Sequence, residues 1–256
     1  MMRIKRVLIP LPSYGFDPSE AAIPWKLMSE NNIEIVFITP DGRKAAADKL
    51  MITGERLGIW KSVLRARQDA INAYIDMEKS ESFNNPLKYN DASENDFDAI
   101  LLPGGHDKGA KEYLESYILQ QLIVAFFRAK KPVAAVCHGV LLAARSIDSE
   151  TGKSVIHSYK TTSLLKSQEL LAYNLTRLWL KDYYLTYPEI TTEDEVRSVL
   201  SDQNQFKKGP KPIQKDSRKK LKRGFVVRDR NYLSARWPGD IYNFSLEFIN
   251  MIHENK

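Results

Sequence analysis

Short apolar runs and longer amphipathic segments alternate along this chain. The runs have the length and β-branched content of buried strands. The longer segments carry apolar residues at helical spacing, and several begin at a polar capping residue or end near Asn, Gly or Pro. The runs predict strands over 7–10, 33–38, 97–102, 132–136, 224–228 and 232–235, with a short one that includes Val155 and Ile156. The amphipathic segments predict helices over 19–30, 60–77, 112–129, 140–144, 164–180 and 241–252.

The order of these elements predicts one doubly wound α/β domain. Strand–helix–strand units imply parallel strand pairs, because each helix carries the chain back to the starting edge of the sheet. The sequence contains no internal repeat and no clean linker, so we expect a single domain over 1–256. Two less regular stretches, at about 41–95 and 182–223, are predicted to be insertions, and each could form a lid.

A single cysteine, Cys137, stands where the strand over 132–136 is expected to break into the helix over 140–144. A reactive residue at such a break is pushed out of the sheet, as in a nucleophile elbow. The helix start beside it offers free N–H groups and the positive end of the helix dipole, which predicts a lowered thiol pKa. A lone cysteine is about as often a small buried hydrophobe, so the pattern leaves both interpretations open.

Two other loops follow strands at the same predicted edge of the sheet. One carries Glu20 at a first helical turn, and the other carries Gly104 and Gly105. Because the carboxyl ends of parallel strands lie along one edge, we expect both loops to meet Cys137. Glu20 would hydrogen-bond the sulfur or pass a proton, and the amides of Gly105 and His138 would hold an oxyanion. Each feature also has a plainer interpretation, since Gly-Gly is a common turn and a Glu at a helix start suits the dipole.

Composition and charge narrow the class of protein. A single cysteine rules out an intrachain disulfide and favours a reducing compartment. The apolar stretch at the N-terminus is too short for a signal peptide, and no run approaches the ~20 apolar residues of a membrane span. We therefore expect a cytoplasmic protein that makes no membrane contact.

The net charge of +6 is unevenly distributed. Nine Lys and Arg residues stand within 207–223 against one acid, Asp216. Such a stretch fits a contact with phosphate or nucleic acid. Its Gly and Pro residues and its lack of aromatic side chains favour a solvated, mobile loop instead, so nucleic acid is not the expected partner.

Four segments together resemble the ThiJ/PfpI superfamily, whose fold is like that of class I glutamine amidotransferases. They are YGFDPSE at 14–20, LLPGGHD at 101–107, AAVCHG at 134–139 and the stretch 234–244, and they span nearly the whole chain in the family's order. The first and third are most similar to the branch of heat-shock chaperone and glyoxalase proteins. The resemblance implies a flavodoxin-like three-layer sandwich with a mostly parallel central sheet and a nucleophile elbow. It also implies a homodimer.

The resemblance assigns roles to three residues. Cys137 corresponds to the family's elbow cysteine, Glu20 to the carboxyl group beside it, and His138 to the histidine that completes a dyad in many members. No true glutamine amidotransferase is expected, because the histidine directly follows the cysteine and no downstream His-x-Glu pair is present.

The chain also departs from the family pattern. In the glyoxalase branch a later acidic residue orients the histidine, but the corresponding stretch, 155–163, has no acid, and Glu169 falls within a predicted helix. Gly104, His106 and His157 are candidate pocket residues. A strand end or an exposed loop would explain the two histidines as well.

These features predict a cysteine-dependent enzyme that acts on small carbonyl substrates. The Cys137 thiolate would add to the carbonyl carbon in a glyoxalase-like conversion or in hydrolysis of a small amide or peptide. No metal or cofactor is expected, since no clustered set of ligands is present. The alternatives are a stress or redox protein with an oxidisable Cys137, and a binding module that uses 207–223.

Overall fold

The computed structural model describes residues 3–255, and a seven-stranded sheet lies at its centre. The strand order is β10-β11-β7-β6-β1-β3-β5. Every neighbouring pair is parallel except β10 with β11, which form an antiparallel hairpin. The predicted α/β class with a mostly parallel sheet is confirmed. The strands are β1 (Arg6–Pro10), β3 (Glu34–Thr39), β5 (Leu87–Lys88), β6 (Ala99–Leu102), β7 (Val133–Val136), β10 (Val226–Asp229) and β11 (Tyr232–Ala235).

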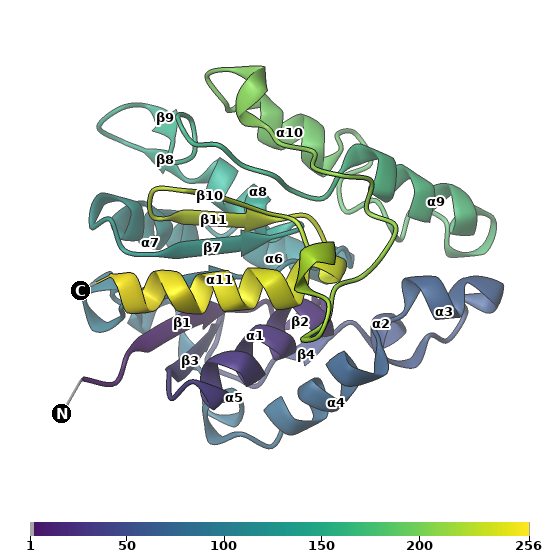
Figure 1. The fold of residues 1–256 in the computed structure, drawn as a ribbon, viewed down its shortest axis with the longest axis horizontal. Helices are drawn as coiled ribbons and strands as arrows, with labels where there is room; N and C mark the ends of the chain where they lie inside the picture. Colours follow the sequence, from purple (N-terminus) through teal and green to yellow (C-terminus); the bar gives the residue numbers. More distant parts are fainter. Residues whose placement is uncertain (1–2, 256) are drawn as a thin grey trace.

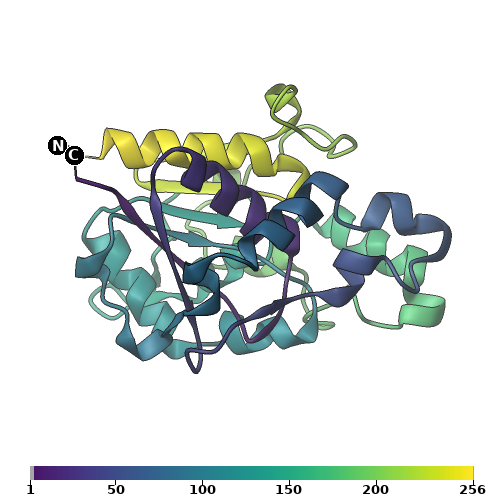
Figure 2. The ribbon, with the colours of Figure 1, turned by 90° about the horizontal axis from the view of Figure 1, so that it is seen from below.

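Helices cover both faces of this sheet (Figure 1, and Figure 2 from below). The resulting three layers are the sandwich that the sequence predicts. One layer contains α1 (Pro18–Glu30), α4 (Gln68–Met77), α5 (Glu81–Asn84) and α11 (Ile241–Glu254). The other contains α6 (Lys111–Leu114), α7 (Tyr117–Arg128) and α8 (Gly139–Arg145).

The central strands are buried on both sides. Val7 and Ile9 of β1 pack into the core beneath α1 and α11, whereas Leu8 between them packs into the core beneath α7 and α8. All three are 0% exposed. Successive strand residues point to opposite faces, so a strand covered on both faces is apolar throughout. This explains why continuous apolar runs located the strands.

The helix predicted over 60–77 is two helices, α3 (Lys61–Leu64) and α4. The backbone is extended on either side of Ala66, whose side chain is buried and whose amide donates to the Met51 carbonyl (3.0 Å). Contact with α2 (Lys49–Thr53) therefore outweighs the helical periodicity of the segment.

The helix predicted over 112–129 is also divided, into α6 and α7. Ser116 starts α7, because its hydroxyl accepts the amide N–H of Leu119 (3.4 Å). The short 3-10 helices of the described chain are Gly58–Trp60, Tyr89–Asp91, Glu94–Asp96, Lys108–Ala110, Gln203–Gln205, Leu221–Arg223 and Pro238–Asp240.

Small sheets lie outside the central one. The prediction of a strand that includes Val155 and Ile156 is wrong. These residues lie in turns that follow a hairpin formed by β8 (Ile147–Asp148) and β9 (Lys153–Ser154). A parallel pair, β2 (Tyr14–Phe16) with β4 (Ala46–Ala47), forms within segments predicted as loops.

The two predicted insertions approach each other at one end of the molecule. There α2 and α3 lie beside α9 (Lys166–Leu180) in both ribbon views (Figures 1 and 2). Met51 and Leu57 from the first insertion pack with Leu180, at the end of α9, and with Tyr184 from the second insertion. We call these facing segments, 48–64 and 178–187, the cover. That the stretches at about 41–95 and 182–223 are insertions stays a prediction.

The basic segment 207–223 is attached to the body of the protein. Asp216 is fully buried, and its carboxylate accepts the amide N–H groups of Tyr242 (3.2 Å) and Asn243 (2.8 Å) in the first turn of α11. The Lys215 ammonium donates to the Val63 carbonyl (3.2 Å). Most of its basic side chains are exposed, as expected of a solvated loop, but these contacts fix the segment in place.

Within residues 3–255 the structure contains neither a membrane-spanning helix nor a cluster of metal ligands. No helix there combines the length and the apolar character that crossing a bilayer requires. No group of three or more His, Cys, Asp or Glu side chains in that range is placed to hold a metal ion.

Candidate active site

Cys137 occupies a strained turn between β7 and α8. Its φ is +57°, in the left-handed region that non-glycine residues rarely adopt. Its amide donates to the Ala235 carbonyl in β11 (3.1 Å), which continues the sheet up to the turn. The side chain is 6% exposed. This is the nucleophile elbow that the sequence predicts.

Gly139 allows α8 to start directly against the end of β6. A Cβ atom at this position would lie 2.2 Å from the carbonyl oxygen of Leu102 and 2.6 Å from that of Pro103. Backbone atoms of a packed sheet cannot move aside, so only glycine fits here. This close approach holds the elbow beside the loop that contains Gly104.

Glu20 reaches the elbow from the first turn of α1. Asp17 caps that helix by accepting the amide N–H groups of Ser19 (2.7 Å) and Glu20 (3.1 Å). The buried Glu20 Oε2 accepts the Gly104 N–H (2.8 Å). A Cβ on Gly104 would lie 2.6 Å from Glu20 Oε2 and 2.9 Å from the Cβ of Cys137. The three loops therefore converge as predicted.

The Cys137 thiol is buried, and carboxyl groups lie close to it. Burial raises the pKa of Cys137 well above its usual value, and the carboxyl groups of Glu20 and Asp17 raise it further, while a backbone hydrogen bond from His138 opposes them. The predicted lowering of the thiol pKa is therefore wrong. The helix α8 has only 7 residues, and burial beside carboxyl groups outweighs the effect of its N-terminus.

Burial also raises the pKa of Glu20 well above its usual value, and Asp17 adds to this shift. The hydrogen bond from the Gly104 N–H and the neighbouring Cys137 thiol lower the pKa of Glu20 in opposition to these shifts. Glu20 Oε1 has no hydrogen-bond partner among the described residues. Glu20 therefore tends to hold a proton close to the sulfur.

His138 is fully buried, and its Nδ1 lies 3.4 Å from the sulfur of Cys137. Burial lowers the pKa of His138 to about 3, with smaller contributions from His106 and Arg145. The imidazole is therefore neutral near pH 7, and a neutral ring can accept a proton.

Two side chains approach the other ring nitrogen of His138. The hydroxyl oxygen of Thr186 lies 3.2 Å from Nε2, and Glu169 Oε1 lies 3.9 Å from it. Both side chains are buried. Burial raises the pKa of Glu169 to about 7.

The sequence did not identify either residue as a neighbour of His138, because Glu169 falls within a predicted helix and Thr186 belongs to no motif. A signal for Glu169 was available, since it stands four positions after the buried Leu165 and seven before the buried Thr176, on the inward face of α9. Thr186 follows the helix in a segment without periodicity, so no local pattern identified it.

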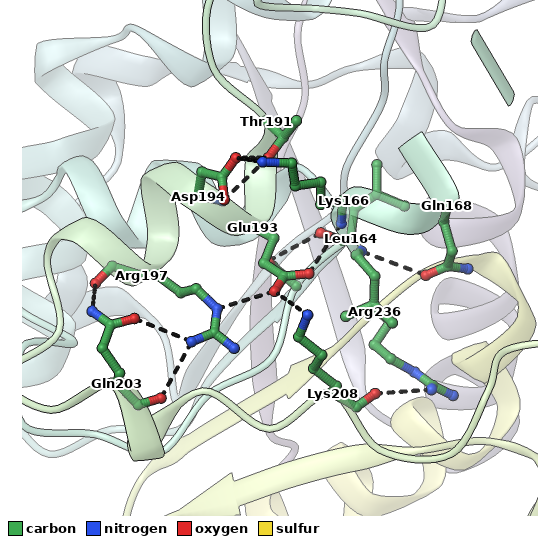
Figure 3. A network of polar contacts seen from close by, with 12 residues as sticks. Leu164, Lys166, Gln168, Thr191, Glu193, Asp194, Arg197, Gln203, Lys208 and Arg236 are labelled. Carbon is green, nitrogen blue, oxygen red and sulfur yellow. Dashed lines mark hydrogen bonds and ion pairs between the residues drawn. The ribbon is translucent and has the colours of Figure 1, made fainter. Parts of the chain in front are cut away.

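A polar network around Glu193 (Figure 3) links the elements that position Glu169. Glu169 Oε2 accepts the amide N–H of Thr192 (2.9 Å), at the start of α10 (Thr192–Ser198), a helix that the sequence did not predict. Glu193 accepts the amide N–H of Lys166 (3.1 Å) and binds the Lys208 ammonium (2.8 Å). These contacts tie α9, α10 and the basic segment together, so the position of Glu169 depends on all three.

The backbone N–H of His138 donates to the Cys137 sulfur, and an oxygen atom bound at the elbow would have to compete for it. Neither this N–H nor that of Gly105 donates to an oxygen acceptor in the described part of the chain. A Cβ on Gly105 would lie 2.4 Å from the Gly15 carbonyl oxygen, so the loop requires glycine here. The oxyanion role assigned to these two amides stays a prediction.

His106 lies between the elbow and the cover. Its ring stacks on Tyr184 with centroids 4.6 Å apart and meets Tyr183 edge-on at 4.8 Å. The Tyr183 hydroxyl donates to Asp48, whose Oδ2 is 3.8 Å from His106 Nε2. A surface cleft of about 320 Å³ beside these groups is lined by Asp48, Tyr183 and Asp107 among others. His106 is not among the residues that line this cleft, so its role as a pocket residue stays a prediction.

The structure does not bring His157 to the elbow. Its Nδ1 lies 2.7 Å from the carbonyl oxygen of Val199, at the end of α10. No hydrogen bond in residues 3–255 links it to Cys137, Glu20 or His138. The plainer interpretation of His157 as a polar structural residue is the one that this geometry supports.

Comparison with known proteins agrees with this fold. A family model described as ThiJ/PfpI family-like matches residues 11–210. The chain therefore belongs to the ThiJ/PfpI family.

Individual relatives show how far the similarity extends. General stress protein 18 of Bacillus subtilis is 38% identical over 146 residues, which are 56% of this chain and 67% of that protein. An uncharacterised protein of Schizosaccharomyces pombe is 27% identical over 127 residues, which are 48% of this chain and 46% of its own length. The match thus spans less than half of that relative.

A solved structure, glyoxalase III from Candida albicans, superposes with a TM-score of 0.71. It is 20% identical, and the match covers 96% of this chain and 97% of that one. Identity at this level establishes a shared fold alone.

Proposed function

We propose that the protein is a cysteine-dependent enzyme that converts small 2-oxoaldehydes to 2-hydroxy acids. The observation that carries this proposal is the contact between the Cys137 sulfur and Nδ1 of a neutral, buried His138. Because the thiol pKa is raised, the nucleophile needs a proton acceptor beside it. Nδ1 of His138, 3.4 Å away, is placed to receive the proton as the S–C bond forms, although burial makes this ring a weak base.

The first step joins the sulfur to the aldehyde carbon. The S–C bond forms as the thiol proton moves to His138 Nδ1 and the carbonyl π electrons move to oxygen. The N–H groups of Gly105 and His138 would stabilise that oxygen, and protonated Glu20 would supply a proton to it. The product is a hemithioacetal.

The second stage moves hydrogen from the former aldehyde carbon to the neighbouring carbon. The proton that His138 took from the thiol first passes to the Glu20 carboxylate, which leaves the imidazole neutral again. His138 then removes the C–H proton while Glu20 protonates the neighbouring carbonyl oxygen, which gives an enediol. The adjacent carbon takes the proton back from His138 as the hydroxyl group next to sulfur returns its proton to Glu20, which gives a thioester of Cys137. Water then attacks the thioester, the C–S bond breaks, and the thiol is restored. The sum is a 2-oxoaldehyde plus water giving a 2-hydroxy acid, with no external oxidant.

The test compares the wild type with three single variants, using methylglyoxal as substrate and lactate as the measured product. Cys137→Ala and His138→Ala are expected to lose turnover by at least a hundredfold, since each removes a group that makes or moves a bond. His157→Gln is the matched control, and it is expected to retain turnover because its ring contacts the Val199 carbonyl. Wild-type protein without turnover would contradict the proposal.

A second candidate is a redox-responsive stress protein. The similarity to a general stress protein and the position of the only cysteine beside Glu20 favour it. One peroxide would convert the thiol to a sulfenic acid with release of water, and a second would give a sulfinic acid. Peroxide titration followed by intact mass tests this role, since two added oxygens on wild type and none on Cys137→Ala would support it.

The partners implied by the resemblance are also proposals. We propose a homodimer that needs no metal or cofactor. Light scattering of the purified chain would measure its mass in solution, and turnover after exhaustive chelation would test the need for a metal. A monomeric mass, or turnover that returns only with added metal, would contradict these expectations.

A further inference from the structure

We propose that Thr186 is a positioning residue that keeps the proton of His138 on Nε2 and so leaves Nδ1 free to accept a proton from Cys137. This inference rests on the proposed role of His138 as a base. It concerns a side chain of the cover, which is distant in sequence from every motif that identified the site.

The hydroxyl hydrogen of Thr186 is already used in a hydrogen bond. Thr186 Oγ1 lies 2.8 Å from the backbone carbonyl oxygen of His106, and a carbonyl oxygen can only accept. Within residues 3–255, no other group donates to that carbonyl. A hydroxyl carries one hydrogen, so the hydroxyl of Thr186 faces its second neighbour with a lone pair.

The second neighbour is Nε2 of His138, 3.2 Å away. A lone pair on Thr186 attracts an N–H and repels an unprotonated ring nitrogen. Both side chains are 0% exposed, so water cannot easily replace the interaction. The contact therefore favours the tautomer with hydrogen on Nε2.

The consequence appears on the opposite side of the ring. A neutral imidazole carries one N–H, and burial keeps His138 neutral. With the hydrogen on Nε2, Nδ1 has a lone pair that points toward the thiol 3.4 Å away. The other tautomer would direct an N–H at the thiol and would leave no base next to it.

Glu169 cannot set the tautomer in the same way. Its Oε1 is 3.9 Å from Nε2, beyond hydrogen-bond distance, and its Oε2 already accepts the Thr192 N–H. At this separation neither the carboxylate nor the protonated carboxyl group of Glu169 fixes which ring nitrogen carries the hydrogen. Thr186, which stays a fixed acceptor at any pH, removes this ambiguity.

The direct test is the tautomer itself, read from long-range ¹H–¹⁵N spectra of uniformly ¹⁵N-labelled protein at pH 7. The chain has four histidines, and a His138→Gln variant identifies the signals of His138. We expect wild type to carry hydrogen on Nε2. Hydrogen on Nδ1 in the wild type would overturn the proposal without any Thr186 variant.

Variants of Thr186 give the second test. Thr186→Ser keeps the hydroxyl and is expected to keep the Nε2–H tautomer. Thr186→Val and Thr186→Ala remove the hydroxyl, and both are expected to shift the ring to a mixture of tautomers. An unchanged tautomer in either folded variant would overturn the proposal, and the smaller Ala serves if Val prevents folding.

A chemical readout accompanies the spectra. Cys137 is the only cysteine, so the rate of alkylation by iodoacetamide reports one thiol. We expect Thr186→Val to alkylate at least fivefold more slowly than wild type at pH 7, and Thr186→Ser to remain within twofold. Neither spectra nor alkylation requires turnover, so absent methylglyoxal activity alongside an Nε2–H ring would contradict the proposed function alone.

Discussion

Cys137 and Glu20 are buried next to each other, and neither side chain ionises easily there. Both side chains are buried, and burial is the largest cause of the raised pKa of each. An activated cysteine usually lies beside a cation, whereas carboxyl groups surround this one. The thiol therefore depends on a neighbouring base, and its reactivity is expected to respond to pH in an unusual range.

The first prediction concerns that pH range. The rate of iodoacetamide alkylation of Cys137 is expected to keep rising above pH ~8.5, the ordinary pKa of a free cysteine, because the reactive thiolate forms only when the raised pKa is passed. Rates measured from pH 6 to 10, with a small thiol in the same buffers as reference, provide the test. A plateau below pH 8 would show that the thiol pKa is lowered instead.

The second prediction concerns Glu169 and the pH dependence of stability. Its pKa is about 7 in the folded protein against an ordinary value of 4.5, so the folded state holds the proton more tightly. That contribution to stability is fully present below pH 4.5 and is lost as the pH rises through 7. Between pH 5 and 8 the loss is on the order of 2–3 kcal/mol.

Glu169→Gln cannot titrate and avoids this loss. Relative to wild type, its free energy of unfolding in urea is expected to improve by that amount between pH 5 and 8. Glu189→Gln, which makes the same change at an exposed carboxyl group, is the control for the substitution itself. A difference for Glu169→Gln that does not change with pH would rule out the raised pKa.

At the scale of elements, the elbow depends on how closely α8 approaches β6. The geometry leaves no volume at Gly139, where the nearest atoms belong to the backbone of the strand end. The strained φ of Cys137 is maintained by this packing and by the sheet hydrogen bond to Ala235. The position of the sulfur is thus a property of the β6–β7–α8 unit.

The third prediction follows from that packing. Gly139→Ala is expected to lower the free energy of unfolding by roughly 3 kcal/mol, because the new methyl group would force the helix away from the strand. Gly152→Ala is the control, since nothing lies within 4 Å of its Cβ position and only its φ of +67° costs energy, about 1–2 kcal/mol. Equal losses in urea unfolding would contradict the packing argument.

At the scale of the whole molecule, segments far apart in sequence close over the site. The cover joins residues 48–64 to residues 178–187 through the Tyr183–Asp48 hydrogen bond and through two bonds between Arg56 and Trp179. Asp48 is buried, so removal of the Tyr183 hydroxyl leaves Asp48 Oδ2 without this hydrogen bond and without water to replace it. Access to Cys137 is therefore expected to depend on how often these segments separate.

The fourth prediction tests the cover directly. Tyr183→Phe removes the hydroxyl that binds Asp48, which weakens the closed arrangement by about 1–2 kcal/mol. The rate of alkylation of Cys137 by iodoacetamide is expected to rise about tenfold, since about 1.4 kcal/mol corresponds to that factor. Tyr117→Phe, at a side chain that is 70% exposed, is the control. An unchanged rate in Tyr183→Phe would mean that the cover does not limit access.

The sequence predicted the features that depend on neighbouring residues. Continuous apolar runs located the central strands except the two-residue β5, and the Cys137-His138-Gly139 turn located the elbow. Glu20 and Gly104 could be assigned to the same site because the carboxyl ends of parallel strands share an edge. These predictions need only local pattern and a general rule of topology.

The tertiary structure decided the features that depend on what surrounds a residue. The periodicity of 60–77 could not reveal that Ala66 would be buried against Met51 and break the helix. The thiol pKa, expected to fall at a helix start, rises because carboxyl groups and burial enclose the sulfur. Thr186 and Glu169 meet His138 only because the cover and α9 fold over it, so distant parts of the chain determine its protonation. Local pattern therefore specified the scaffold, and desolvation and long-range contact, which no stretch of sequence encodes alone, specified its chemistry.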